Sequence, residues 1–386
     1  MDKARIAVVL FLGNMLMSGL ACGGGGEPVA TPTPISIYPF SLAVITDLHI
    51  GRGFDDYGTP GHDDELIDGE NYCLTYRLAD TVNWINSNYE NDNIKFLVII
   101  GDISDTAEKS EFLKVKEILG DLKIPYIPLM GNHDVWSFTG DDEELMATGD
   151  EYFQEVFWDS TPMENPQRLL TTFGDSWEKQ PTPIYSYVHD RYFYLQNYAC
   201  SYGEINIICL DYTRRDSHLV PLSVFAEPFT QTNEWLEEHL KEHPGETVMV
   251  FSHYPYMVIG GVLPQDVDFF NDAVHASNCN VLSFGGHIHA LHNGESYNVN
   301  KNFQAQFTDI PVIVTKSMME PDLDFLRVVT VEGPSIAEIH YDQIESPTAV
   351  ATDPNIATEP LSEIILEFIE AQLRFWTSGL LNLSPI

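Results

Sequence analysis

Residues 281–293 read VLSFGGHIHALHN, an apolar run followed by two glycines and by two histidines with one residue between them. In an extended strand, side chains two positions apart point to the same face. His287 and His289 can therefore converge on one point near the end of a strand. Convergent imidazoles are typical of metal sites, although a His-x-His pair also occurs in ordinary loops. The other strand ends of the chain decide between these alternatives.

Four further apolar runs alternate with helical patterns, and this alternation predicts an α/β layered fold. Including the first run, the predicted strands lie near residues 41–46, 95–100, 124–130, 247–252 and 280–285. Helices are expected near residues 72–88 and 107–119. The aromatic-rich stretch 185–198 predicts strands and a hairpin that decorate this core.

Each of these five runs ends in residues of a type that binds metals. In chain order they are Asp47 and His49, Asp102 and Asp105, Asn132 and His133, His253, and finally His287 and His289. In open α/β sheets, ligands bind beyond the carboxyl ends of the strands, so these side chains are expected to meet at one edge. Each residue alone could instead belong to a turn or a helix cap. One metal site explains all five placements together, and we therefore favour it.

The ordered set Asp-x-His, Gly-Asp-x-x-Asp, Gly-Asn-His-Asp, His and Gly-His-x-His spans about residues 41–290 and resembles the calcineurin-like metallophosphoesterase superfamily. The resemblance implies an α/β fold: a four-layer α/β/β/α sandwich of two mixed sheets flanked by helices, with a dinuclear metal site at the strand ends. It implies that one metal is held by Asp47, His49, Asp102 and His289, and the other by Asp102, Asn132, His253 and His287. It also implies that His133 is the proton donor to the leaving group and that Asp105 orients it.

Carboxylate, imidazole and amide ligands suit two divalent ions of Mn, Fe or Zn, and the sequence does not choose among them. Two such ions can share a hydroxide, orient a phosphoryl group and neutralise charge on the entering and leaving oxygens. The glycines beside the ligands are expected to permit sharp backbone reversals and positive φ angles. These glycines are Gly101, Gly131, Gly285 and Gly286.

The resemblance therefore implies a metal-dependent phosphoester hydrolase that attacks phosphorus in line. Thr106 stands where the phosphoprotein phosphatases carry arginine, and Asp105 stands where the purple acid phosphatases carry a metal-binding tyrosine. The sequence His253-Tyr254-Pro255 looks more like the bacterial phosphodiesterase branch. We expect a phosphodiesterase. The alternatives are a phosphomonoesterase or nucleotidase of the same fold, and a non-catalytic metal-binding surface lipoprotein.

The charge of the chain restricts its partners. It carries 19 basic and 58 acidic residues, for a formal net charge of −39. Such a surface repels nucleic-acid backbones and anionic membranes, so broad binding to either is not expected. The expected partner is a small phosphoester substrate, attracted locally by the bound cations. The sequence does not define the oligomeric state.

The N-terminus predicts export. Residues 1–22 have the layout of a signal peptide, with a lipobox-like end at Cys22, although Gly19 stands where leucine is usual. Residues 23–40 read as a Gly/Pro/Thr-rich tether, 41–345 as the metallophosphoesterase domain, and 346–386 as a linker and an amphipathic helix. We expect a lipoprotein anchored in the periplasm or on the cell surface, or a freely secreted protein. The lipid is then the only expected contact with a membrane.

The remaining cysteines permit two interpretations. Cys73, Cys200, Cys209 and Cys279 allow up to two disulfides in an oxidising compartment. Cys209 lies in the apolar run INIICL, which favours a buried free thiol instead.

Overall fold

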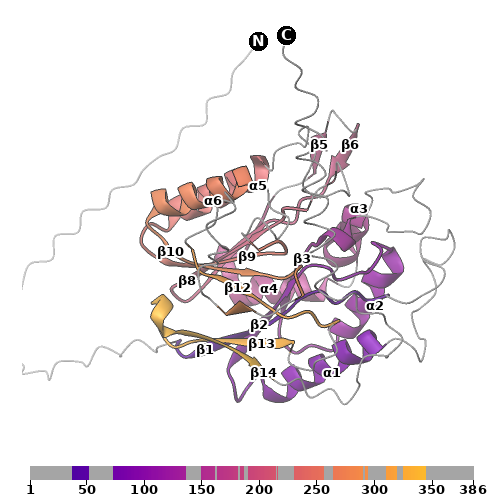
Figure 1. Cartoon of the computed structure of the whole chain (residues 1–386). Coiled ribbons are helices and arrows are strands. Elements are labelled where there is room, and N and C mark those ends of the chain that lie inside the picture. The colour runs from indigo at the N-terminus through magenta and orange to yellow at the C-terminus, as the bar shows by residue number, and fades with distance from the viewer. Residues whose placement is uncertain are drawn as a thin grey trace, which may run out of the picture. The chain divides into compact units, whose positions relative to one another are not determined.

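The computed structural model describes most of the chain between residues 37 and 344 (Figure 1). The described residues are 37–51, 73–135, 149–160, 163–180, 183–186, 190–213, 215, 230–255, 264–289, 292–293, 310–319 and 325–344. The predicted signal peptide, nearly all of the tether, and the C-terminal linker and helix lie outside them and stay predictions. None of the helices among the described residues is both long enough and apolar enough to cross a bilayer.

The first sheet has five strands in the order β14-β13-β1-β2-β3. Their bounds are Phe40–Ile45 (β1), Ile94–Ile100 (β2), Tyr126–Leu129 (β3), Leu326–Val331 (β13) and Ile339–Ile344 (β14). Strands β1, β2 and β3 run parallel, whereas β13 is antiparallel to both β1 and β14. The carboxyl ends of β1, β2 and β3 therefore meet at one edge of this sheet.

The second sheet has seven strands in the order β11-β12-β10-β9-β8-β7-β4. Their bounds are Glu178–Lys179 (β4), Tyr198–Tyr202 (β7), Ile205–Leu210 (β8), Thr247–Ser252 (β9), Asn280–Gly285 (β10), His292–Asn293 (β11) and Val312–Val314 (β12). Strands β8, β9, β10 and β12 are parallel, and β7 and β11 pair antiparallel at the two sides. Both sheets are thus mixed, as predicted.

Alternating side chains on the second sheet show which layer packs against each of its two faces. Met249 and Phe251 on β9 pack into the cluster that contains the first sheet, whereas Val248 and Val250 pack into another cluster with Trp235 and other residues of the helices. Those helices are α5 (Thr230–Glu242) and α6 (Pro264–Ser277). Because successive residues of a strand point to opposite faces, the second sheet lies between the first sheet and α5 and α6.

The first sheet is covered by α1 (Cys73–Asn88) and α2 (Lys109–Leu119), whose Leu78 and Phe112 belong to the same cluster as its strands. Figure 1 shows this pair of helices and the α5–α6 pair on opposite sides of the two sheets. The predicted four-layer α/β/β/α sandwich is therefore confirmed.

Smaller elements surround this core. They are α3 (Gly149–Gln154), which continues into a π-helical turn at Glu155–Asp159, α4 (Glu164–Phe173), and the hairpin of β5 (Ile184–Ser186) and β6 (Arg191–Phe193). The helix expected from residue 107 begins at Lys109, because Ala107 has a φ of 58° and the Glu111 carboxylate accepts the Glu108 N–H at 3.1 Å. This carboxylate caps the first turn, so the helix starts later than its periodicity suggests.

The cysteines of the core are not cross-linked. Cys200, Cys209 and Cys279 are buried free thiols. Burial raises the pKa of the Cys209 thiol, which keeps it protonated. The prediction of a buried free thiol at Cys209 is confirmed, and a pair of disulfides built from the four cysteines is excluded.

Candidate metal centre

The loops that follow β1 and β2 are joined by backbone hydrogen bonds at the edge where the ligands were predicted. Asp47 N–H donates to the Gly101 carbonyl at 3.1 Å, and His49 N–H donates to the Asp102 carbonyl at 2.9 Å. The second sheet joins the same edge, because His253 Nδ1 bonds the Ile100 carbonyl at 2.9 Å. Loops from both sheets are therefore held together by hydrogen bonds to main-chain carbonyl groups.

The seven predicted ligands come together at this edge. Among the described residues, three groups have their ligand atoms within 4.8 Å of one another: Asp47 with His49 and His289, Asp102 with His253 and His287, and His49 with Asp105 and His133. Only the first two groups consist entirely of predicted ligands. The seventh, Asn132, places its Oδ1 at 3.2 Å from His253 Nε2 and so joins the second group. The first group holds three of the four residues of one predicted ligand set, and the second group with Asn132 holds the four residues of the other, so the division into two ligand sets stays a prediction.

Asp102 belongs to the second group and also faces the first. Its Oδ2 is 3.2 Å from His253 Nε2 in the second group and 3.7 Å from His49 Nε2 in the first. Its Oδ1 accepts the backbone N–H of His133 at 2.9 Å, which fixes the orientation of the carboxylate. A single oxygen thus faces both groups, as a bridging ligand requires.

Asp47 is oriented by several donors in the first group. Its carboxylate accepts the Thr46 hydroxyl at 2.7 Å and the His287 N–H at 3.1 Å, and its Oδ1 lies 3.3 Å from His289 Nε2. Ser317 bonds the Asp47 carbonyl at 3.1 Å. Neither Thr46 nor Ser317 was predicted, because neither is a ligand type and Ser317 is 270 positions from Asp47.

The electrostatics of the cluster favour charged carboxylates. Burial alone would raise the pKa of Asp102, but His253 and His133 hold it well below its usual value. Burial lowers the pKa of His253, yet Asp102 outweighs this and raises it to about 9. Burial and the proximity of His253 lower the pKa of His287 to about 3, so its ring is neutral. A neutral imidazole beside two ionised carboxylates has its lone pair available for a cation.

The chemistry of the donor atoms fits divalent metals. His49 is buried, its Nδ1 bonds the Asp105 carboxylate at 2.8 Å, and its Nε2 has no hydrogen-bond partner. An Nδ1–H held by a carboxylate leaves the lone pair on Nε2, and this second-shell arrangement is typical of metal-bound histidines. Among the described residues, only imidazoles form ion pairs with the buried Asp47 and Asp102. A cation would satisfy both the Nε2 atom and the two carboxylates.

His133 differs from the seven predicted ligands in its surroundings. Its Nδ1 bonds the backbone carbonyl of Asp105 at 2.6 Å, and its ring lies edge-on to His49 with centroids 4.5 Å apart. The side chain is 25% exposed, whereas that of His49 is 1% exposed. His133 is thus fixed at the border of the cluster, where its side chain is partly exposed to solvent.

Asp105 is placed differently from its predicted role. Its carboxylate lies 2.8 Å from His49 Nδ1 but 4.0 Å from His133 Nδ1. The main contact with His133 is made by the backbone carbonyl instead. The residue therefore orients His133 through its main chain and His49 through its side chain. The sequence could not distinguish these roles, because both histidines belong to other loops.

The prediction of positive φ angles at four glycines is wrong for Gly131, Gly285 and Gly286, since only Gly101 has one (74°). The ligands adopt the left-handed conformation themselves. Positive φ angles occur at Asp47 (52°), His49 (44°), Asp102 (47°), His287 (65°) and His289 (54°). Such values are uncommon for residues with side chains and collect at functional sites.

Gly131 and Gly286 supply space instead. A Cβ atom at Gly131 would lie 2.1 Å from Asp102 Oδ1, and one at Gly286 would lie 2.0 Å from Thr46 Oγ1. Both distances are shorter than any non-bonded contact, so these positions must lack a side chain. The two glycines let the main chain approach the carboxylates that face the centre.

Asp134 is a structural residue of the centre that the sequence analysis did not single out. Its fully buried carboxylate accepts four bonds: Ile103 N–H at 3.1 Å, Gly131 N–H at 2.8 Å, and the N–H and hydroxyl of Ser104, both at 2.8 Å. It therefore fastens the loop after β2 to the loop after β3. Burial and the nearby Asp102 raise the pKa of Asp134 to about 7, whereas the four donors favour its charged form.

Asp134→Asn is expected to lower the free energy of unfolding by about 1–3 kcal/mol, the cost of leaving a buried donor without a partner. An amide offers one acceptor oxygen, so its NH₂ group must face at least one backbone N–H. Urea denaturation measures the change, with Asp121→Asn on the exposed surface as the control. A loss no larger than that of the control would contradict the fastening role.

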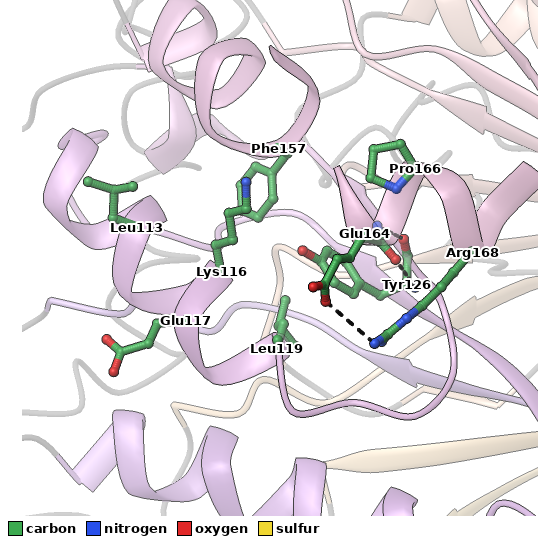
Figure 2. Close-up of a pocket in the computed structure, with 11 residues that line it drawn as sticks. Leu113, Lys116, Glu117, Leu119, Tyr126, Phe157, Glu164, Pro166 and Arg168 are labelled. Atoms are coloured by element: carbon green, nitrogen blue, oxygen red, sulfur yellow. Dashed lines mark hydrogen bonds and ion pairs between the residues drawn. The ribbon is translucent and has the colours of Figure 1, made fainter. Parts of the chain in front are cut away.

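A pocket of about 300 Å³ lies elsewhere, between α2, α4 and the start of β3 (Figure 2). Leu113, Lys116, Tyr126 and Phe157 contribute to its lining, and the Glu164–Arg168 ion pair lies beside Tyr126. None of the predicted ligands lines it. It adjoins the beginning of β3, whereas the metal centre adjoins the end, so it is not part of the candidate site.

The fold and the site together define an α/β sandwich protein with a dinuclear metal centre between the strand ends of its two sheets. The chain belongs to the calcineurin-like phosphoesterase family, whose model matches residues 40–291. Phosphoesterases of this family use a dinuclear divalent metal centre, and the clustered aspartates and histidines supply ligands for it in this chain. The donor set leaves the identity of the metals open.

Several solved structures resemble the chain. A purple acid phosphatase, PPD1, from yellow lupin (Lupinus luteus) seeds is 13% identical with a TM-score of 0.44, over 84% of this chain and 54% of its own. A 5'-nucleotidase from Candida albicans is 13% identical with a TM-score of 0.43, over 87% and 58%. A novel archaeal phosphodiesterase is 10% identical with a TM-score of 0.29, over 79% and 99%. The chain thus spans little more than half the length of the first two. A comparison with curated protein sequences found no match.

Proposed function

We propose that this protein is a metal-dependent phosphoester hydrolase, and that its substrates are phosphodiesters. The observation that carries the proposal is the position of His133, which is partly exposed beside the buried ligand cluster and lies outside both predicted ligand sets, where it is grouped only with His49 and Asp105. A purely structural metal site has no use for a solvent-facing imidazole at this position. The proposed roles are those predicted from the sequence, with seven ligands and His133 as the general acid.

The proposed mechanism divides the chemistry between the metals and the chain. Two bound divalent ions neutralise phosphoryl charge and lower the pKa of water, which provides a nucleophile at neutral pH. Asp102 would hold both ions when they are bound, and His49 and His253 are each oriented by an Nδ1 hydrogen bond. His133 is anchored at Nδ1 by the Asp105 carbonyl, which directs its Nε2, the atom proposed to protonate the leaving oxygen, away from the anchor.

The choice of a diester rests on the sequence His253-Tyr254-Pro255. Tyr254 is buried with its ring edge-on to His287 at 4.6 Å, so its contribution is to support a ligand. A phosphomonoesterase or nucleotidase would use the same cluster and the same acid. The two substrate classes differ in charge at phosphorus, and a direct comparison of rates distinguishes them.

A panel assay tests the proposed function. The purified chain is reconstituted with Mn, Fe or Zn and supplied with phosphomonoesters, linear diesters and cyclic nucleotides. We expect metal-dependent release of product, with the highest kcat/KM on a diester. Preference for a monoester would support the nucleotidase alternative. If two metals bind per chain but no ester is hydrolysed, the protein is the non-catalytic metal-binding alternative.

We further propose that the protein is exported and anchored by a lipid on Cys22. This proposal rests on the lipobox-like sequence and on the tether that follows it. Cys22→Ser is expected to release the protein from the membrane fraction or to block its processing, since a serine cannot carry the thioether-linked lipid. Fractionation and N-terminal sequencing measure the effect. A soluble wild-type protein whose N-terminus lies beyond residue 22 would contradict the anchor and support secretion.

A further inference from the structure

A group of two aspartates and two arginines, three of them buried and Arg191 half-buried, lies next to the loop that carries Asn132 and His133. It consists of Asp150, Asp211, Arg191 and Arg215. We propose that Arg215 is a positioning residue, which holds both ends of the loop at residues 130–135 and thereby fixes His133 for proton donation. This inference deepens the proposed function and rests on it for its catalytic consequence.

Arg215 is itself rigidly held. Its Nη1 and Nη2 donate to the two oxygens of Asp211 at 2.8 Å and 2.7 Å, a bidentate pair. Asp211 also accepts the N–H groups of Gln196 at 2.9 Å and Thr213 at 3.0 Å. Both charged residues are almost completely buried. Bidentate pairing fixes direction as well as distance, so the guanidinium has one defined orientation.

Arg215 holds the first end of the loop at Met130, the residue after β3. Its Nη2 lies 3.3 Å from Met130 Sδ. The Thr213 hydroxyl bonds the Met130 carbonyl at 3.3 Å, and the Thr213 carbonyl in turn accepts a bond from Arg215 Nη1. The side chain and the carbonyl of Met130 are therefore both tied to the same guanidinium, one directly and the other through Thr213.

Asp150 on α3 connects Arg215 to the other end of the loop. Its Oδ2 lies 3.5 Å from Arg215 Nε and accepts the Tyr194 N–H at 3.0 Å, while its Oδ1 accepts a bond from Arg191 at 2.7 Å. The preceding residue, Gly149, donates its N–H to the Val135 carbonyl at 3.2 Å.

Gly149 packs closely against the loop at residues 130–135. A Cβ atom at Gly149 would lie 2.1 Å from the Asp134 carbonyl oxygen, so the start of α3 lies directly against the loop. Arg215 thus contacts Met130 at one end and, through Asp150 and Gly149, residues 134–135 at the other. A shift of the guanidinium would act on both ends of the loop together.

Two physical arguments connect this arrangement to catalysis. Buried ion pairs contribute little net stability compared with apolar residues of similar size, and in some proteins they fix one conformation instead, which is the role we propose for Arg215. A proton donor is sensitive to such geometry, because displacement by about 1 Å can lower a rate about 100-fold. The Asp105 carbonyl that anchors His133 lies on another loop. Movement of residues 130–135 would therefore shift the His133 ring relative to this carbonyl.

The test compares Arg215→Lys with a matched control, Arg77→Lys. Lysine keeps the charge at position 215 but cannot reproduce the bidentate bond to Asp211 together with the contacts to Met130 and Asp150. Arg77 is equally buried, on α1, and packs over the Phe325 ring at 4.5 Å, so this control reports the general cost of trimming a buried guanidinium. The full-length chain is used throughout.

Three quantities are measured for each variant: bound metal, hydrogen exchange of residues 130–135, and kcat on two phosphoesters. For Arg215→Lys we expect two bound metals and exchange at least about 10-fold faster. The kcat for the ester with a nucleoside leaving group, a poor one, should fall about 10–100-fold. The kcat for the ester that releases nitrophenolate should fall less than about 3-fold. Arg77→Lys should change exchange of these residues and either rate by less than about 3-fold.

Unchanged exchange at residues 130–135 in Arg215→Lys, or equal slowing of both esters, would overturn the positioning role. If Arg215→Lys does not fold, Thr213→Val removes only the bond to the Met130 carbonyl, and the same selective slowing is expected in smaller measure. Equal or absent slowing in that variant would also overturn the proposal. If the wild-type protein hydrolyses no ester, the proposed function fails, and hydrogen exchange alone decides whether Arg215 holds the loop.

Discussion

Asp102→Asn is expected to lower kcat/KM on every phosphoester by about 10³-fold or more, and to reduce the bound metal from two ions to at most one per chain. Charge stabilisation by the metals is worth several kcal/mol, and each 1.36 kcal/mol corresponds to a tenfold change in rate. Asp102 Oδ2 is the atom that faces both His49 Nε2 and His253 Nε2. An amide at this position keeps the shape of the side chain but loses the charge that two cations share.

The fold of this variant should persist, because the amide oxygen can still accept the His133 N–H. Metal analysis, kcat/KM and thermal unfolding of Asp102→Asn are compared with those of the exposed Asp121→Asn. Retention of two metals with near-normal turnover would show that the bridging ligand has been wrongly assigned.

His133→Ala is expected to slow esters of poor leaving groups, such as nucleosides, by about 10²–10⁴-fold, the usual contribution of general-acid catalysis. Esters that release nitrophenolate need little protonation, so their rates should fall much less. The metal content should stay near two, since the Nδ1 of His133 is bonded to the Asp105 carbonyl and the residue belongs to neither predicted ligand set. The measurement is a plot of rate against leaving-group pKa for both proteins.

Asp105→Asn provides the matched comparison. Because its carboxylate contacts His49 Nδ1 rather than His133, this variant should weaken metal binding by about 10–100-fold, the usual effect of losing a second-shell partner. It should also slow good and poor leaving groups alike. If His133→Ala loses a metal ion, or if it too slows all esters equally, His133 is not the general acid.

The sequence was sufficient to predict the strands and ligand positions that a local pattern of residues specifies. Apolar runs predicted β1, β2, β3, β9 and β10, because a buried strand must be apolar whatever its partner. The residues after these runs converge since parallel strands bring their carboxyl ends to one edge. The seven ligand positions could therefore be proposed without coordinates. The structure brings six of them into two groups, with Asn132 beside the second group and Asp102 Oδ2 3.7 Å from His49 Nε2 of the first.

The sequence did not predict which strands lie next to each other in a sheet when they are far apart in the chain. Strand β13 follows β1 by almost 300 positions, yet it lies between β1 and β14 and runs antiparallel to both. The runs that form β12, β13 and β14 were not assigned as strands. Strand partners depend on burial and on loop closure across the whole chain, and these do not appear in a local pattern.

The same division holds inside the site. The sequence by itself determined which residue types stand at each strand end, because these follow directly from the order of the chain. Only the tertiary structure decided that the Asp105 carboxylate contacts His49, that the ligands rather than three of the glycines adopt positive φ angles, and that Arg215 lies behind Met130. Each of these depends on distances between loops far apart in the sequence, which are fixed by the close packing of the two sheets.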